Sequence, residues 1–326
     1  MAFSGTIGAT SFNALKVVEH AFRRCRLPAQ GITAEMTAYA LESLYTILSE
    51  LASTNTPSWC IEKILLPLYE NQPIVPLPIG TIDVLNINYR VLQEVTGATT
   101  TALTSYTTFF TTATIVNTVG IKWSASAVPV SFQVSSDGIV WTTVGTSSAT
   151  AASGDITWTD ISGAKAYLYF RVLAAIPLSF TSITLGNMPQ EIPLGQLNRD
   201  NYVNQSNKVF AGRPSNYFFQ RNVAQPVVNI WPAPFSAAEK AQLVVWRHRQ
   251  IMDTANLQQD VEVPVRWLEA IINTLGARVA AETPQVDPQI MAALEQKSAI
   301  SLARAWAGDG DGSSTLIQPN IGVYTR

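Results

Sequence analysis

The stretch from Asn207 to Ala280 constrains the fold more than any other part of the chain. Asn216–Arg221 and Val227–Trp231 are rich in aromatic and β-branched residues, which favour strands. Pro232-Ala233-Pro234 must end the second strand, because proline has no amide proton for a ladder bond. A third strand is predicted over Ala241–Arg249, so this region forms a β-meander.

A helix is predicted to begin at Pro264, since proline is favoured at the first helical position. The residues Trp267, Ile271, Leu275 and Val279 recur every four positions and define one apolar face. The stretch therefore changes from strand to helix after the third strand.

This order of elements resembles the head-to-tail adaptor proteins of short-tailed phages, the packaged-DNA-stabilisation and tail-accessory proteins. Gly31–Met36, followed by a long helix, is similar to the same family. The resemblance does not extend to the middle of the chain. It implies a structural virion protein in a ring of twelve copies under the portal, where it extends the DNA channel, retains packaged DNA and offers a platform for the tail.

Two helices are expected near the N-terminus and one near the C-terminus. Ser11 can cap the first helix, and Thr33 can cap a second that runs to about Leu51. Asp287 and Pro288 can open the last helix, which the glycines from Gly308 end. With the helix from Pro264, these helices can bury their apolar faces as a four-helix bundle.

The middle of the chain is predicted to be all-β, because short alternating runs recur without a helical pattern. Ser136-Asp137-Gly138 separates two runs and predicts a hairpin turn. This turn, Trp141, Trp158 and the run Tyr167–Val172 resemble a discoidin-type sandwich of the galactose-binding-like jelly rolls. The predicted strands are Val119–Trp123, Val130–Ser135, Val140–Val144, Ala166–Leu173 and Phe180–Leu185.

The expected fold class is α+β: a helical bundle with a small antiparallel sheet, interrupted by an all-β jelly-roll-like sandwich. Strands near Ile64–Tyr69 and Ile82–Tyr89 are expected to join the later meander in the small sheet. The expected divisions are 1–96 and 188–307 for the two parts of the adaptor core, 97–187 for the inserted sandwich and 308–326 for an extended tail.

Charged residues make up only 13% of the chain, and the formal net charge is −2. This balance argues against a basic nucleic-acid clamp and is compatible with a channel past which double-stranded DNA slides. Two cysteines and two histidines give neither a disulfide framework nor a histidine-rich metal site. No catalytic motif stands out, so neither an enzyme nor a cofactor is expected. The chain shows no signal segment, and synthesis in a host cytoplasm is expected.

Two hypotheses from different classes follow. In the first, the chain is a virion adaptor at the head–tail junction, with the portal and tail nozzle or tailspike proteins as partners and no membrane contact. The portal-contacting residues are then expected in the tail: Ile317, Pro319, Ile321, Val323, Tyr324 and Arg326. In the second, the inserted sandwich binds host-surface glycans, with Trp141 and Trp158 as a stacking platform, unless one of them is a core residue.

Overall fold

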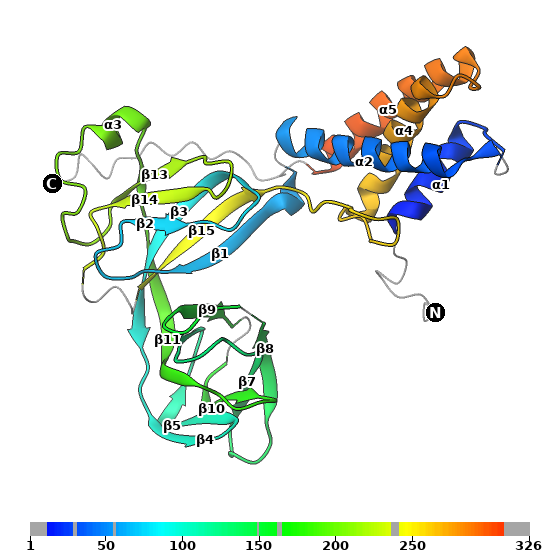
Figure 1. Cartoon of the computed structure of the whole chain (residues 1–326). Coiled ribbons are helices and arrows are strands. Elements are labelled where there is room, and N and C mark those ends of the chain that lie inside the picture. Colours follow the sequence, from blue (N-terminus) through cyan, green and yellow to red (C-terminus); the bar gives the residue numbers. More distant parts are fainter. Residues whose placement is uncertain are drawn as a thin grey trace. The chain divides into compact units, whose positions relative to one another are not determined.

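The computed structural model describes residues 12–28, 31–54, 57–148, 150–161, 165–235 and 241–309. The chain is α+β and divides into two compact units, which Figure 1 shows. A helical unit combines residues 1–61 with 249–326, and a β unit comprises residues 62–248. The helical unit is thus built from both ends of the chain.

The helical unit contains α1 (Ala14–Arg24), α2 (Ala34–Thr54), α4 (Val265–Glu282) and α5 (Pro288–Asp309). The predicted four-helix arrangement is confirmed, with α4 in contact with each of the other three helices. Its apolar residues explain this position, because the side chains predicted for its face are all buried. They are Trp267, Ile271, Leu275 and Val279.

The helix caps differ in detail from the sequence prediction. Asn13 caps α1, and its side chain accepts a hydrogen bond from the Lys16 amide at 3.0 Å. The prediction of Ser11 is therefore wrong, because Asn13 is the residue next to the first helical turn, and Ser11 lies outside the described residues. Thr33 does cap α2, since its Oγ1 accepts from the Met36 amide at 3.2 Å. Pro264 lies at the N-cap position of α4, one residue before the first helical residue Val265, so the helix begins one residue later than predicted.

Three tryptophans join α4 and α5 to the short 3-10 turn Ser58–Cys60. The Trp267 ring is fully buried, and its centroid lies 4.8 Å from that of Trp59 and 4.7 Å from that of Trp306. Both pairs meet edge to face, a favourable geometry for aromatic rings. Next to them, Asp309 accepts hydrogen bonds from the Ser58 amide at 2.8 Å and from the Ser58 hydroxyl at 2.6 Å. These contacts fix the end of α5 against the turn that precedes the β unit.

The β unit contains three sheets. A six-stranded sheet has the order β1 (Ile61–Pro67), β15 (Ala241–Arg249), β3 (Thr81–Glu94), β11 (Phe180–Pro193), β6 (Thr118–Trp123) and β9 (Ile156–Asp160). A five-stranded sheet has the order β4 (Ala98–Ala102), β5 (Ser105–Thr114), β10 (Tyr167–Ala174), β7 (Val130–Ser135) and β8 (Thr142–Ser147). A four-stranded sheet has the order β12 (Gly195–Gln196), β13 (Asn216–Gln220), β14 (Val227–Trp231) and β2 (Ile74–Pro76).

The predicted antiparallel pairing of the first two meander strands, β13 and β14, is confirmed. The prediction is wrong for the third strand, because β15 lies between β1 and β3 in the six-stranded sheet and does not pair with β14. The strands β1 and β3, which were expected in the small sheet, are likewise in the six-stranded sheet. β14 pairs with β13 on one side and with β2 on the other, so segments far apart in sequence share one sheet. Its inner face packs on β1, β3 and β15 around a core that includes Ile87, Ile230 and Leu243. The region on either side of the sandwich therefore forms one core.

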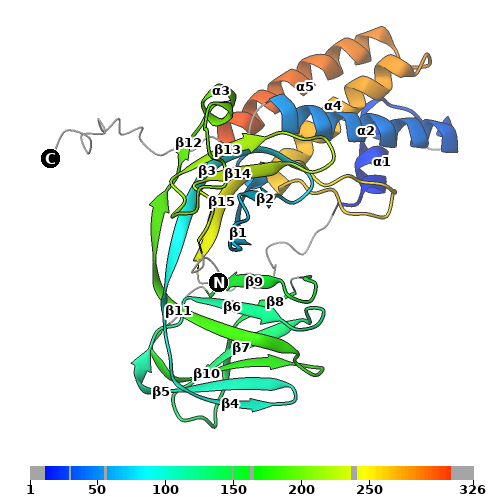
Figure 2. The ribbon, with the colours of Figure 1, turned by 60° about the vertical axis from the view of Figure 1, so that its left-hand side comes forward.

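The sandwich core lies between the five-stranded sheet and the β11–β6–β9 end of the six-stranded sheet. Phe132 and Phe170 contribute from the first sheet, and Ile121 and Trp123 from the second. Figure 2 shows β3 and β11 running from the region of β13, β14 and β15 into the sandwich. These two long strands pair with each other and connect the two regions. The insertion is thus attached through continuous strands.

A cluster of charges crosses the six-stranded sheet at this junction. Arg90 is 3% exposed, and its guanidinium donates to Asp160 at 2.7 Å and to Glu191 at 3.0 Å. Lys63 also donates to Asp160, at 2.8 Å. Four strands, β1, β3, β9 and β11, are therefore tied together by two cations and two carboxylates.

This cluster predicts an acid-sensitive β unit. Burial raises the pKa of Asp160, but the hydrogen bonds and charges of Lys63 and Arg90 outweigh burial and hold that pKa below its usual value. A carboxyl whose folded pKa is depressed stabilises the fold above its unfolded pKa of about 4, and this stabilisation is lost as the pH falls through the folded pKa. We expect the stability difference between wild type and Asp160→Asn, measured by urea unfolding, to shrink from pH 7 to pH 3. A difference that stays constant over this range would contradict the assignment.

Candidate functional site

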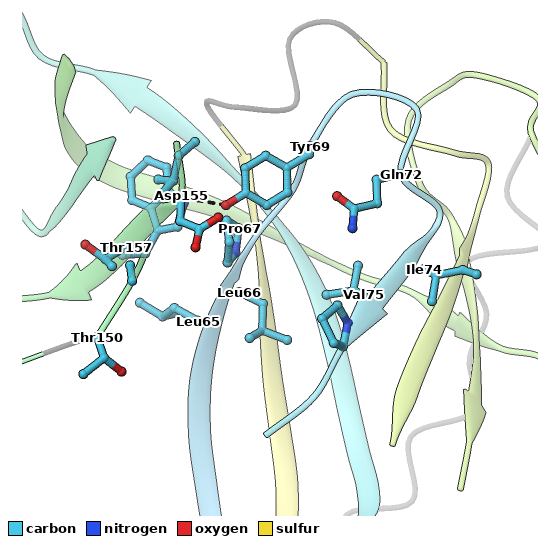
Figure 3. Close-up of a pocket in the computed structure, with 14 residues that line it drawn as sticks. Leu65, Leu66, Pro67, Tyr69, Gln72, Ile74, Val75, Thr150, Asp155 and Thr157 are labelled. Atoms are coloured by element: carbon cyan, nitrogen blue, oxygen red, sulfur yellow. Dashed lines mark hydrogen bonds between the residues drawn. The ribbon is translucent and has the colours of Figure 1, made fainter. Parts of the chain in front are cut away.

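A cavity of about 490 Å³ lies between two walls (Figure 3). The end of β1, the turn after it and β2 form the first wall, and Thr150, Ala151, Asp155 and the start of β9 form the second. Both walls belong to the β unit. The lining combines apolar and polar surface in comparable amounts. The lining includes Leu65, Tyr69, Gln72, Thr150, Asp155 and Trp158.

The first wall turns back on itself because Asn71 takes a left-handed conformation, with φ of 57°. This turn joins β1 to β2 and places Tyr69 and Gln72 on the cavity. The Tyr69 hydroxyl accepts a hydrogen bond from the Ile156 amide at 3.0 Å, which Figure 3 shows as a dashed line. The two walls are therefore held together by a direct bond next to the cavity.

Trp158 forms part of the second wall. It pairs directly across from Gly120 of β6, and a side chain at Gly120 would come within 2.4 Å of the indole ring. The ring atoms nearest Gly120 belong to the six-membered ring, so the pyrrole edge with Nε1 points away from β6. This Nε1 is buried and has no acceptor among the described residues.

Asp155 is the charged member of the lining among the described residues. Its turn is fixed by backbone bonds, because the Trp123 amide donates to the Asp155 carbonyl at 3.0 Å. One carboxylate oxygen, Oδ2, accepts from the Ala152 amide at 3.0 Å. In Figure 3 the carboxylate lies beside Tyr69 and Pro67, with Gln72 on the opposite wall.

Gly120 gives a direct test of this wall. Gly120→Ala is expected to destabilise the β unit by about 1–3 kcal/mol, because the added methyl group forces the buried indole to shift. Gly145→Ala is the matched control, since its new methyl group would lie 3.5 Å from Phe132, an ordinary contact distance. Urea unfolding followed by tryptophan fluorescence measures both. Equal stabilities of the two variants would show that Trp158 does not pack on Gly120.

The structure does not bring Trp141 and Trp158 together. Trp158 is buried with Leu92 and Ile156, on the face of its sheet opposite to the sandwich core. Trp141 is half-buried at the other sheet, where the Arg171 guanidinium lies 3.9 Å from its ring centroid. The two indoles therefore cannot form one stacking platform, and Trp158 is a core residue, the alternative that the sequence left open.

The hairpin motif explains the position of Trp141. Gly138 has a φ of +76°, as predicted for this turn, and Asp137 accepts from the amides of Ile139 and Val140, each at 2.9 Å. The Trp141 Nε1 donates to the Gly138 carbonyl at 3.2 Å. The Ser-Asp-Gly-x-x-Trp pattern thus forms a turn, and the indole that follows it packs against the sheet.

The predicted portal-contacting residues lie outside the described residues. They are Ile317, Pro319, Ile321, Val323, Tyr324 and Arg326. Among the described residues, no group of three or more His, Cys, Asp or Glu side chains could hold a metal ion. Within that same part of the chain, no helix is long and apolar enough to span a membrane.

The sequence did not identify Tyr69, Gln72 or Asp155. Tyr69 and Gln72 are in a proline-rich connection whose path depends on the pairing of β2 with β14. A signal for Asp155 was present, since it is one of few charges in the Thr- and Ser-rich middle of the chain. The sequence could not show that Tyr69 forms the wall facing Asp155, because the two residues are far apart in the chain.

No protein-family model and no curated protein matches this chain. Among solved structures, it is similar to the module CpGH89CBM32-5 of Clostridium perfringens, in complex with GalNAc-β-1,3-galactose, with 10% identity over 40% of this chain and 99% of that one and a TM-score of 0.23. It is also similar to CBM32-1 from a family 31 glycoside hydrolase of Clostridium perfringens, with 10% identity, 41% and 98% coverage and a TM-score of 0.23. A chitosan-binding module of a Paenibacillus sp. IK-5 chitosanase/glucanase has 18% identity, 39% and 95% coverage and a TM-score of 0.21. All three similarities concern only part of the chain.

Proposed function

We propose that the β unit binds carbohydrate and that the cavity between Tyr69 and Trp158 holds the sugar. The observation that supports this proposal is that one cavity presents both apolar side chains and hydrogen-bonding groups. Aromatic and aliphatic side chains suit the apolar face of a sugar ring, while the Gln72 amide and the Asp155 carboxylate can bond its hydroxyl groups. A preformed cavity of about 490 Å³ is within the usual range for small ligands.

The site proposed from the structure differs from the platform proposed from the sequence. Trp141 is covered by Arg171 and hydrogen-bonded to Gly138, so it is already engaged in packing. Trp158 contributes an edge to the cavity instead of an exposed ring face. The proposal therefore rests on the cavity and does not involve Trp141.

Glycan-array binding by the full chain tests this function. Thr150→Trp is expected to abolish binding, because Thr150 is an exposed lining residue and an indole there fills the cavity without entering the core. Gln72→Ala is expected to weaken binding by removing one hydrogen-bonding group. The matched control is Thr101→Trp on the exposed strand β4. If no glycan binds, or if Thr150→Trp binds as well as Thr101→Trp, the proposal is wrong.

A second candidate is the adaptor of a phage head–tail junction, which one observation in the helical unit favours. The buried residues of the 22-residue helix α5 are Leu294, Ser298 and Ala305, and much of its remaining surface consists of alanines and the exposed Ile300. These exposed apolar positions, which lie among the charged Glu295, Lys297 and Arg304, suit contact with other protein chains. We propose, as this alternative, a virion protein made in the host cytoplasm that forms a ring of twelve copies between the portal and the nozzle or tailspike proteins, around passing double-stranded DNA.

Electron microscopy of the purified chain mixed with the portal of the same virus tests the alternative. A twelve-fold collar below the portal is expected, and deletion of Leu316–Arg326 is expected to prevent its formation, because this segment contains the proposed portal contacts. Circular dichroism of the truncated chain controls for folding. If the chain does not associate with the portal at several salt concentrations, the adaptor proposal is wrong. If the truncated chain still assembles, the proposed portal contacts in Leu316–Arg326 are wrong.

A further inference from the structure

The described lining of the cavity carries charge of one sign only, which is negative. Asp155 is its charged lining residue among those described, and no Lys, Arg or His belongs to the described lining. A ligand in the cavity therefore faces a carboxylate at close range without a cation in the lining to balance it. We infer that Asp155 makes the cavity selective for uncharged and amino sugars and against sugar acids, an inference that rests on the proposed carbohydrate function.

The position of Asp155 supports this role. Its turn is held by the Trp123 amide on its carbonyl, and its Oδ2 accepts from the Ala152 amide, so the carboxylate is fixed at the edge of the cavity. A hydroxyl or ammonium group of a sugar can donate to this carboxylate, whereas a second carboxylate cannot donate when ionised. Two like charges at close range also repel each other, and more strongly in a site that partly excludes water.

The nearby cations do not offset this charge. Lys63 of β1 is 2.8 Å from Asp160, and Arg90 of β3 is paired with both Asp160 and Glu191. Lys122 of β6 pairs across from Ile156 and so shares its face of the sheet, but it is not a lining residue and already has an interaction of its own. Lys122 is therefore the cation whose influence the experiment must separate from that of Asp155.

The test compares sugars that share a ring and differ in charge. Binding of the full chain to glucose, glucosamine and glucuronic acid, and to galactose, galactosamine and galacturonic acid, is measured by NMR titration at low and moderate salt. We expect at least one neutral sugar and its amino form to bind, and the matching acid to bind at least about tenfold more weakly. The amino sugar is expected to lose affinity as salt rises, because its attraction to Asp155 is screened.

Asp155→Asn is the informative variant, since it removes the charge and keeps an oxygen for the Ala152 amide. It should remove the discrimination against the acid and lower the affinity for the amino sugar. Asp200→Asn, at an exposed position of the short helix Arg199–Val203, is the control for net charge and should change neither.

The outcomes separate the two proposals. If neither wild type nor Asp155→Asn binds any of the sugars or any array glycan, the carbohydrate function is wrong and the selectivity falls with it. If sugars bind but the acid binds as tightly as the neutral sugar, or if Asp155→Asn keeps the discrimination, the selectivity is wrong and the carbohydrate function remains. Tight binding of the acid that is lost in Lys122→Ala would also overturn it and would assign the selectivity to Lys122.

Discussion

Trp267→Ala is expected to destabilise the helical unit by about 3–5 kcal/mol, the usual cost of removing a large buried aromatic side chain. The Trp267 ring is fully buried between Trp59 and Trp306, so alanine would leave a cavity and break both edge-to-face pairs. Because α4 contacts every other helix of the unit, the surrounding side chains cannot collapse freely into that cavity. Chemical denaturation followed by circular dichroism at 222 nm reports on the helices and measures the loss.

Two further variants make this prediction sharper. Trp267→Phe is expected to cost less than alanine, because the Trp267 Nε1 has no acceptor among the described residues and its removal breaks no described hydrogen bond. Ile300→Ala, at an exposed position of α5, should change stability by no more than about 0.5 kcal/mol. A loss for Trp267→Ala as small as that for Ile300→Ala would mean that the three tryptophans do not form the core described here.

Arg90→Met is expected to destabilise the β unit by about 3 kcal/mol, the lower end of the range for breaking a buried ion pair. Arg90 is almost fully buried, whereas Asp160 and Glu191 keep about a third of their side-chain exposure, which limits the cost of leaving them unpaired. Their repulsion adds to this cost, since both carboxylates face the place that the guanidinium leaves. Urea unfolding followed by tryptophan fluorescence measures the effect.

The matched control for Arg90 is Lys63→Met. Lys63 contacts the same carboxylate, Asp160, but is itself about one-third exposed, so its removal should cost no more than about 1 kcal/mol. The triple variant Arg90→Met, Asp160→Asn and Glu191→Gln should recover part of the stability, because the unpaired charges are gone. If Lys63→Met proves as costly as Arg90→Met, burial does not decide the strength of these pairs.

Local patterns predicted the elements that bury a regular face. The four-residue spacing from Trp267 to Val279 gave α4 its buried face, and the alternation over Val130–Ser135 predicted β7 with its observed bounds. The Ser136-Asp137-Gly138 turn was also correctly predicted, because glycine at a left-handed position leaves a clear signal. In each case the information lies within a few residues, where periodicity and turn chemistry operate.

The strands β4, β5 and β9 were not predicted, although β5 and β9 bury some of their residues. All five residues of β4, Ala98–Ala102, are exposed at a sheet edge, so the sequence has no apolar alternation there. The last helix was located correctly, and its buried residues are Leu294, Ser298 and Ala305. Periodicity predicts a strand or helix only to the extent that packing imposes it.

The sequence by itself determined the α+β class, the helical bundle and the presence of a sandwich, since each follows from local apolar periodicity. The tertiary structure alone decided the candidate site. Tyr69 bonds to Ile156, and Trp158 lies on Gly120, across separations in sequence that no local pattern spans. Register and strand order decide which side chains share a face, and these depend on the whole sheet. The function of a cavity made from such distant segments therefore becomes visible only once the chain is folded.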